Sequence, residues 1–172
     1  MSFMKQLEGR GAGGRRVLVR PYGIADRDGV RRMSDRLSAT SLYTRFFSGT
    51  PYIPEHYLGL LDGLDHWNSE ALVALDGDEI IGSAEYVRLA KRPWCADIAV
   101  LVTDPWQRHG VGSALVARLA ELAERRGITE FGADVTLTNQ GGLLFIRHGW
   151  PAARSTRDGG AAHFHLPLPM PA

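Results

Sequence analysis

The strongest constraint on the fold lies in residues 95–126, where a strand-like run leads through a short loop into a long amphipathic helix. The run Cys95–Thr103 is predominantly apolar and is predicted to form a strand. From Gly110 to Arg126 the apolar residues recur at helical spacing, so that Leu115, Leu119 and Leu122 share one face. Strands and helices that alternate in this way predict an α/β fold.

The remaining segments also read as short strands and helices. Further strands are predicted at Val17–Arg20, Ala71–Leu75, Glu79–Val87, Phe131–Val135, Ala153–Arg157 and Ala162–Leu166. Helices are predicted after a cap at Asp26, from a cap at Ser38 to Phe47, from Glu55 to Leu64 and from Asn139 to Arg147. Gly127 is expected to form the C-terminal cap of the helix that ends at Arg126. Pro93 is expected to break the chain before the strand at Cys95. Glycine turns at residues 76–78 and 158–160 indicate hairpins, which make the sheet mixed.

The length and composition predict one domain. With 172 residues, 44% of them apolar, the chain can bury one core but is short for two. Residues 1–15 are rich in glycine and lack periodicity, so we expect a flexible N-terminal leader there. We expect residues 16–172 to form the single domain.

Composition also narrows the function classes. Lys and Arg number 20 against 19 Asp and Glu, a formal net charge of +1, which does not favour nucleic acid as a partner. No apolar run is long enough to span a bilayer, so no membrane partner is expected. The single Cys95 cannot form an intramolecular disulfide. The expected location is the cytoplasm.

The junction between the strand at 95–103 and the following helix is predicted to bind a phosphate group. A helix start presents free N–H groups and the positive end of the helix dipole, and Gly110 and Gly112 let a ligand approach the backbone. No Gly-Lys-Ser/Thr triplet is present, and Leu115 stands where a dinucleotide loop would need a third glycine. Nucleoside triphosphates and dinucleotides are therefore disfavoured.

The loop Gln107-Arg108-His109-Gly110-Val111-Gly112 resembles the acyl-CoA loop of the GNAT superfamily of N-acyltransferases, Gln/Arg-x-x-Gly-x-Gly/Ala. Residues 145–150, Phe-Ile-Arg-His-Gly-Trp, resemble the family's Tyr-x-x-x-Gly-Phe ending, and residues 43–47 are similar to bacterial GNAT domains found in protein-lysine acetyltransferases. The resemblance covers residues 16–168. It implies a GNAT-like acyl-CoA N-acyltransferase fold, with a mixed, twisted sheet of about seven strands and flanking helices.

The resemblance further implies acetyl-CoA as the co-substrate. The main chain of residues 100–102 would pair with the pantetheine arm, backbone N–H groups of residues 108–113 would hold the pyrophosphate, and Asn139 would lie beside the arm. The cofactor-binding residues implied in this way are Val100, Leu101, Val102, Gln107, Arg108, His109, Gly110, Val111, Gly112, Ser113, Asn139 and Phe145.

Amine attack on a thioester requires an unprotonated amine, because a free lysine has a pKa near ~10.4. Asp97 interrupts an apolar strand and is the first candidate for the base; Glu85 is the second. A structural carboxylate bonded to a neighbouring backbone group or arginine is the alternative for Asp97. Phe145 stands where many relatives have a tyrosine that protonates the leaving thiolate, so the general acid is undetermined.

Other reactive side chains have simpler interpretations. Cys95 has no histidine near it in sequence and is interpreted as a buried small residue rather than an acyl carrier. His148, His163 and His165 lack a recognisable ligand spacing, and no metal is predicted.

The sequence thus predicts an N-acetyltransferase that moves an acetyl group directly to an amine, either a protein lysine or a small molecule. A non-catalytic acyl-CoA sensor is the alternative, and a small basic binding module is a third interpretation that the balanced charge disfavours. The oligomeric state stays open, with a homodimer as one alternative.

Overall fold

A computed structural model of the protein describes residues 15–172. They form one seven-stranded sheet with the strand order β1-β2-β3-β4-β5-β7-β6, in which only β4 and β5 are parallel neighbours. The strands are β1 (Leu18–Pro21), β2 (Ser69–Asp76), β3 (Glu79–Leu89), β4 (Arg92–Val102), β5 (Glu130–Thr136), β6 (Arg154–Asp158) and β7 (Ala161–Pro167). The mixed sheet predicted from the hairpins is confirmed, whereas the leader predicted at 1–15 lies, apart from residue 15, outside the described residues.

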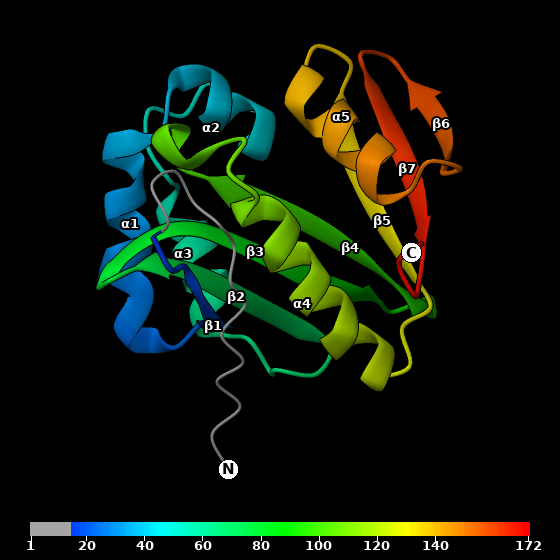
Figure 1. Ribbon diagram of the computed structural model, residues 1–172, viewed down its shortest axis with the longest axis horizontal. Coiled ribbons are helices and arrows are strands. Elements are labelled where there is room, and N and C mark those ends of the chain that lie inside the picture. The colour runs from blue at the N-terminus through cyan, green and yellow to red at the C-terminus, as the bar shows by residue number, and fades with distance from the viewer. Residues whose placement is uncertain (1–14) are drawn as a thin grey trace.

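The helices pack on both faces of the sheet, the three N-terminal helices on one face and the two C-terminal helices on the other (Figure 1). The helices are α1 (Arg27–Arg32), α2 (Ala39–Phe46), α3 (Glu55–Asp62), α4 (Val111–Arg125) and α5 (Gln140–Gly149), with short 3-10 turns η1 (Ile24–Asp26), η2 (Met33–Arg36) and η3 (Asp104–Trp106). The first three helices pack on one face of β2–β4. On the opposite face α4 covers β1–β4 and α5 covers β5 and β7.

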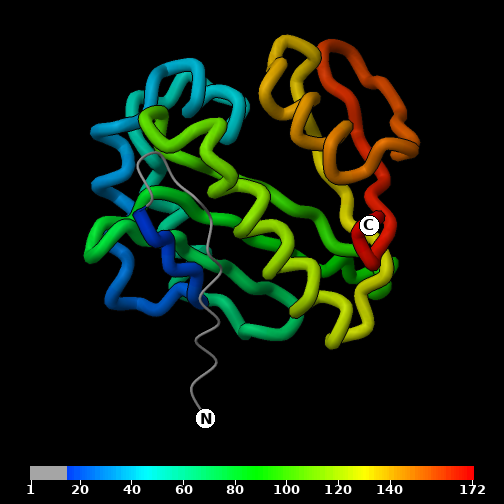
Figure 2. The backbone as a smooth tube through the Cα atoms, in the orientation of Figure 1, coloured from blue at the N-terminus to red at the C-terminus, as the bar shows by residue number. Residues whose placement is uncertain are grey.

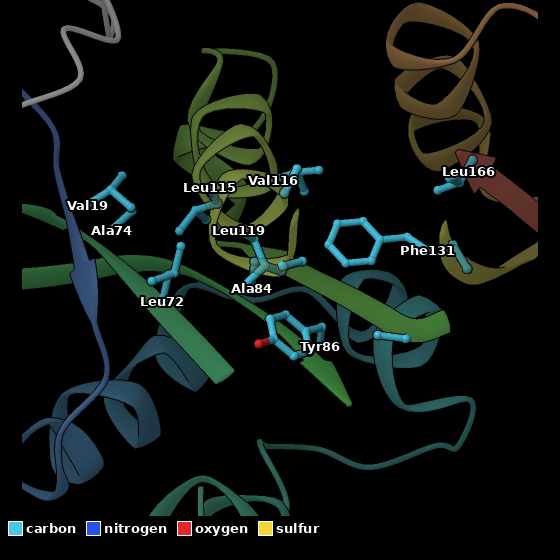
Figure 3. Packing of buried hydrophobic residues seen from close by; sticks show 14 of the residues in the cluster. Val19, Leu72, Ala74, Ala84, Tyr86, Leu115, Val116, Leu119, Phe131 and Leu166 are labelled. Carbon is cyan, nitrogen blue, oxygen red and sulfur yellow. The ribbon is translucent and has the colours of Figure 1, made fainter. Parts of the chain in front are cut away.

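The predicted apolar face of α4 forms the centre of the larger core. Leu115 and Leu119 are fully buried against Leu72 and Ala84 of the sheet, as Figure 3 shows. Gly127 follows the helix with φ +80°, the left-handed conformation expected at a C-terminal cap. This packing positions the N-terminus of α4 at the end of β4.

Two local predictions about the chain are wrong. Pro93 does not precede the strand but lies inside β4, where the register between β3 and β4 shifts and a proline can be accommodated. Asp26 does not cap α1 through its side chain; its carboxylate accepts from the Gly23 N–H at 2.9 Å and pairs with Arg20. The Ser38 cap is confirmed, since its Oγ accepts from the Ser41 N–H at 3.1 Å.

The sheet divides between β4 and β5. These strands pair only over Cys95–Asp97 and Glu130–Gly132, and both continue beyond that point without pairing to each other. The tube view shows β4 and β5 diverging from a shared end (Figure 2). Because strand edges carry N–H and C=O groups that need partners, the divergence leaves an edge of β4 available to a ligand.

Candidate active site

A cavity of about 680 Å³ passes through the sheet where β4 and β5 diverge. On the face of α4 and α5 its walls include Val100, Val135 and Phe145. On the opposite face, where α2 and α3 pack, its walls include Glu85 and Asp97. A ligand from one face of the sheet can therefore meet a second ligand from the other face inside one cavity.

The loop before α4 and the first turn of this helix present backbone donors beside Val100, which lies in the wall of the cavity. Arg108 and Gly110 both have positive φ, 63° and 80°, and Gly110 is the N-cap residue of α4. The first main-chain bond of the helix runs from the Ala114 N–H to the Gly110 carbonyl at 3.0 Å. The N–H groups of residues 111–113 precede it and have no acceptor within the helix, as is general for a first turn. This arrangement suits an anion.

Side chains of the loop hold its shape. The Gln107 amide donates to the Val102 carbonyl at 3.0 Å and to Ser41 Oγ at 3.1 Å, which ties the loop to β4 and α2. His109 packs edge-to-face on Trp106, with ring centroids 6.3 Å apart. Both residues therefore have structural partners, and their predicted contact with a cofactor stays a prediction.

Gly112 lies where three predicted cofactor-binding side chains converge. A Cβ at this position would lie 3.7 Å from Val100, 3.8 Å from Val102 and 3.9 Å from Phe145. These are ordinary contact distances, so a methyl group would fit without moving its neighbours. The missing side chain leaves a space the size of one methyl group between these side chains of β4 and α5.

Asn139 and Phe145 border the same cavity from α5. The Asn139 Oδ1 accepts from the Gly142 N–H at 2.9 Å and so caps α5. Phe145 is half-buried and carries no hydroxyl that could protonate a thiolate. The structure brings both residues to the predicted place, and their binding roles stay predictions.

Glu85, the second candidate base, is held in an ion pair. Its carboxylate accepts hydrogen bonds from Arg45 of α2 and from the Tyr57 hydroxyl of α3. Burial lowers the pKa of the Arg45 guanidinium, but the charges of Glu85 and Tyr57 and the hydrogen bonds to them together leave that pKa above its ordinary value. Burial together with Glu85 also raises the pKa of Tyr57, so its hydroxyl stays protonated. Arg45 stacks on Phe46, 4.7 Å from the ring centroid.

Asp97 has a different environment, at the last position where β4 pairs with β5. Burial raises the pKa of its carboxyl group, and Asp134 adds to the rise, whereas His163 and Arg92 lower it. No arginine or backbone N–H bonds to this carboxylate among residues 15–172, in contrast to the structural alternative considered from the sequence. An acid with a raised pKa that borders a cavity suits proton transfer.

Several residues of the cavity have no counterpart among the sequence predictions. Arg45 and Tyr57 could not be assigned because their contact with Glu85 depends on how α2 and α3 pack on β3. The similarity of residues 43–47 to GNAT domains was the one available signal for Arg45. Cys95 is buried beside Glu130, and burial raises the pKa of its thiol, which does not favour a nucleophile.

Two further properties of residues 15–172 bear on other classes of function. None of the helices within residues 15–172 has the length and apolar character that crossing a bilayer requires. Over the same residues, no three His, Cys, Asp or Glu side chains are grouped so that they could bind a metal ion.

The sequence model of the acetyltransferase (GNAT) family matches residues 36–150, which is more than half of the chain. The chain therefore belongs to this family of acetyltransferases. The resemblance noted from residues 107–112 and 145–150 is confirmed, and so is the expected fold.

Individual proteins are similar to this chain in sequence or in structure. Acetyltransferase PA5475 of Pseudomonas aeruginosa is 31% identical over 121 residues, which are 68% of this chain and 64% of that protein, so the match spans less than two thirds of its length. The crystal structure of the GNAT domain of PAT from S. lividans superposes with a TM-score of 0.86 at 25% identity, covering 96% of this chain and 97% of that one. The putative acetyltransferase yncA of Salmonella typhimurium, solved with acetyl-CoA, has a TM-score of 0.71 at 16% identity and covers 88% and 94%.

Proposed function

We propose that this protein transfers an acetyl group from acetyl-CoA directly to an amine. The observation that carries the proposal is the cavity that crosses the sheet between β4 and β5. Its walls include Asp97, a carboxylate whose pKa is raised, and Val100 of β4, which lies beside the first turn of α4. Two substrates that approach from opposite faces can thus react without a covalent enzyme intermediate.

The α4 face suits the co-substrate. Along residues 100–102 the edge of β4 away from β3 has no strand partner and can pair with the amide groups of the pantetheine arm, while the Val102 carbonyl also accepts from Gln107. The first turn of α4 offers N–H groups to the pyrophosphate. Gly112 leaves room between them, and Asn139 and Phe145 border the same space. The acetyl-CoA in the structure of yncA supports this choice of ligand.

The opposite face suits the amine. An alkylammonium ion must lose a proton before it attacks, and Asp97 borders the cavity with the higher proton affinity that a base requires at neutral pH. Glu85 is neutralised by Arg45, so we assign it a positioning role rather than the role of base. Apolar walls from Leu60, Leu61 and Leu64 suit an aliphatic chain behind the amine.

The test is thiol release from acetyl-CoA in the presence of a panel of amines, which should include lysine-rich proteins and small diamines. Intact-mass analysis of each acceptor should show a gain of one acetyl group. Calorimetry with CoA alone should show binding. Absence of affinity for both CoA and acetyl-CoA would exclude the proposal.

The absent hydroxyl at Phe145 favours one other function, a non-catalytic acyl-CoA sensor. A sensor would bind acetyl-CoA in calorimetry but release no thiol with any acceptor. We also propose a cytoplasmic location, which is supported by the intracellular co-substrate and by the single buried, unpaired Cys95. Fractionation of cells that express the full chain tests the location.

A further inference from the structure

A histidine that the sequence did not assign to the site lies against Asp97. Asp97 on β4 and Gly132 on β5 are register partners, and β7 continues the sheet beyond β5. A Cβ on Gly132 would lie 2.5 Å from Asp97 Oδ1 and 3.0 and 3.2 Å from Cε1 and Nε2 of His163. The carboxylate and the imidazole therefore meet over a position that has no side chain.

Asp134 determines which ring nitrogen of His163 carries the proton. The His163 Nδ1 lies 2.7 Å from Asp134 Oδ1 across the β5–β7 ladder. Because an ionised carboxylate only accepts hydrogen bonds, Nδ1 must donate, and in the neutral ring Nε2 keeps its lone pair. This lone pair lies on the edge of the ring that approaches Asp97. Asp97, His163 and Asp134 thus follow one another, in this order, from the cavity outward.

Asp97 and Asp134, the two ends of this series, are both exposed, and His163 between them is half-buried. The His163 side chain is 31% exposed and the Asp134 side chain 60% exposed, so the far end of the series is in contact with solvent. This face of β5 and β7 carries the polar residues Asp134, His163 and His165, while α5 packs on the opposite face. A proton that reaches His163 can therefore leave to water without crossing the apolar core.

We propose that His163, held by Asp134, relays the proton that Asp97 removes from the acceptor amine. The inference rests on the proposed function. The amine enters as an ammonium ion; one proton passes to Asp97 and through His163 Nε2 to solvent. The nitrogen then attacks the thioester carbonyl carbon and the carbon–sulfur bond breaks. The second proton lost by the nitrogen ends on the thiolate, so that the net products are the amide, CoA thiol and one proton.

No direct hydrogen bond joins Asp97 to His163 in the part of the chain that the structure describes. Transfer between them therefore takes place through one bridging water or after a small side-chain rotation. His163 acts through Asp97 and is a positioning and relay residue rather than a catalytic one. Gly132 is required by this geometry, because a side chain there would separate the two groups.

Other ionisable groups surround the pair and contribute to any pH dependence. The groups on β4, β5, β6 and β7 are Arg92, Cys95, Glu130, Arg154 and His165. The groups across the cavity, on α2, α3 and β3, are Arg45, His56 and Glu85. His165 offers a matched comparison, since its side chain is 28% exposed and its Nδ1 lies 3.0 Å from Glu130 rather than beside Asp97.

The experiment compares His163→Gln with His165→Gln in the full chain. Carbon-13 NMR titration of the Asp97 carboxyl carbon should show a higher Asp97 pKa in His163→Gln, because the ring that lowers this pKa is gone. The His165→Gln protein should titrate like the wild type. Identical Asp97 titrations in all three proteins would overturn the proposal whether or not an acceptor is known.

Kinetics supply the second measurement. His163→Gln should lower kcat about tenfold with KM for acetyl-CoA unchanged, and the acid limb of the kcat profile should move to higher pH. Asp134→Asn should lower kcat about threefold through loss of the favoured tautomer. Wild-type kcat in His163→Gln would overturn the relay. A protein that acetylates nothing would instead contradict the proposed function, and the NMR titration would still decide whether the two side chains are coupled.

Discussion

Two carboxylates border the same cavity from neighbouring strands but have opposite surroundings. Glu85 on β3 lies under α2 and α3, where Arg45 and Tyr57 bond to it. Asp97 on β4 lies at the edge of the divergence, beside His163 and without an arginine bonded to it among the described residues. The first environment gives the carboxylate a cation and a hydroxyl donor as fixed partners, whereas the second raises the pKa of the carboxyl group.

The difference indicates that the divergence of the sheet, rather than residue type, separates a carboxylate with bonded partners from one without them. Where β3 and β4 pair fully, helices cover the sheet and supply fixed partners. Where β4 leaves β5, the carboxylate of Asp97 at the boundary is exposed and faces the cavity instead of a bonded partner. A base can work only in the second situation, because it must exchange its proton with a ligand.

The largest expected effect separates Asp97 from Glu85 directly. Asp97→Asn should lower kcat roughly 100- to 10,000-fold at neutral pH, while the Kd for CoA stays within about twofold of the wild type. Steady-state thiol release and calorimetry measure the two quantities. In the wild type, kcat should fall as the pH drops through an Asp97 pKa that lies above the ordinary value, because the base must be ionised.

Thermal unfolding is the control for this variant. A raised pKa means that folded Asp97 binds its proton more tightly than unfolded Asp97, so the ionised form destabilises the fold above that pKa. Asp97→Asn should therefore unfold at the same temperature as the wild type or at a higher one. Full activity in this variant would remove Asp97 from the mechanism.

The next effect concerns stability in the Glu85 region. Glu85→Gln leaves the Arg45 guanidinium, whose side chain is only 15% exposed, without its counter-ion, and should lower the free energy of unfolding by roughly 2 to 3 kcal/mol. Urea denaturation measures the change. Glu79→Gln is the matched control, because Glu79 pairs with Arg36 but is 53% exposed and should change stability by less than about 1 kcal/mol. Equal free energies of unfolding for the two variants would mean that the buried Arg45–Glu85 pair contributes no more to stability than the exposed Arg36–Glu79 pair.

A smaller effect tests the α4 side of the divergence. Gly112→Ala should fold normally, since its Cβ meets neighbours at 3.7 Å or more, but should weaken acetyl-CoA binding about tenfold by filling ligand space. Calorimetry measures the affinity. Gly59→Ala on α3 is the control, since nothing lies within 4 Å of its Cβ, and it should bind like the wild type. Unchanged affinity in Gly112→Ala would place the ligand elsewhere.

The smallest effect concerns the leaving group. Phe145→Tyr adds a hydroxyl to a side chain that borders the cavity and should raise kcat about threefold by protonating the thiolate. Phe145→Leu keeps an apolar residue and should give no increase. A tyrosine variant no faster than the leucine variant would show that thiolate departure does not limit the rate.

Local interactions explain what the sequence alone determined. The amphipathic face of α4, the Ser38 cap and the Gly127 terminus depend on residues a few positions apart, and all three match the structure. The same holds for the position of the loop at residues 107–112, because it follows from where a strand ends and a helix begins. Pro93 was misplaced because the irregular β3–β4 pairing that accommodates it joins strands and is not a local property.

Only the tertiary structure decided which polar side chains meet. Arg45 and Glu85 are 40 residues apart in the chain, and His163 and Asp134 are 29 apart. Their contacts depend on helix packing and on strand register, and a slip of one residue would turn every side chain of a strand to the other face. The divergence after Asp97 likewise depends on how β5, β7 and α5 pack together, and so the surroundings of both carboxylates follow from long-range packing.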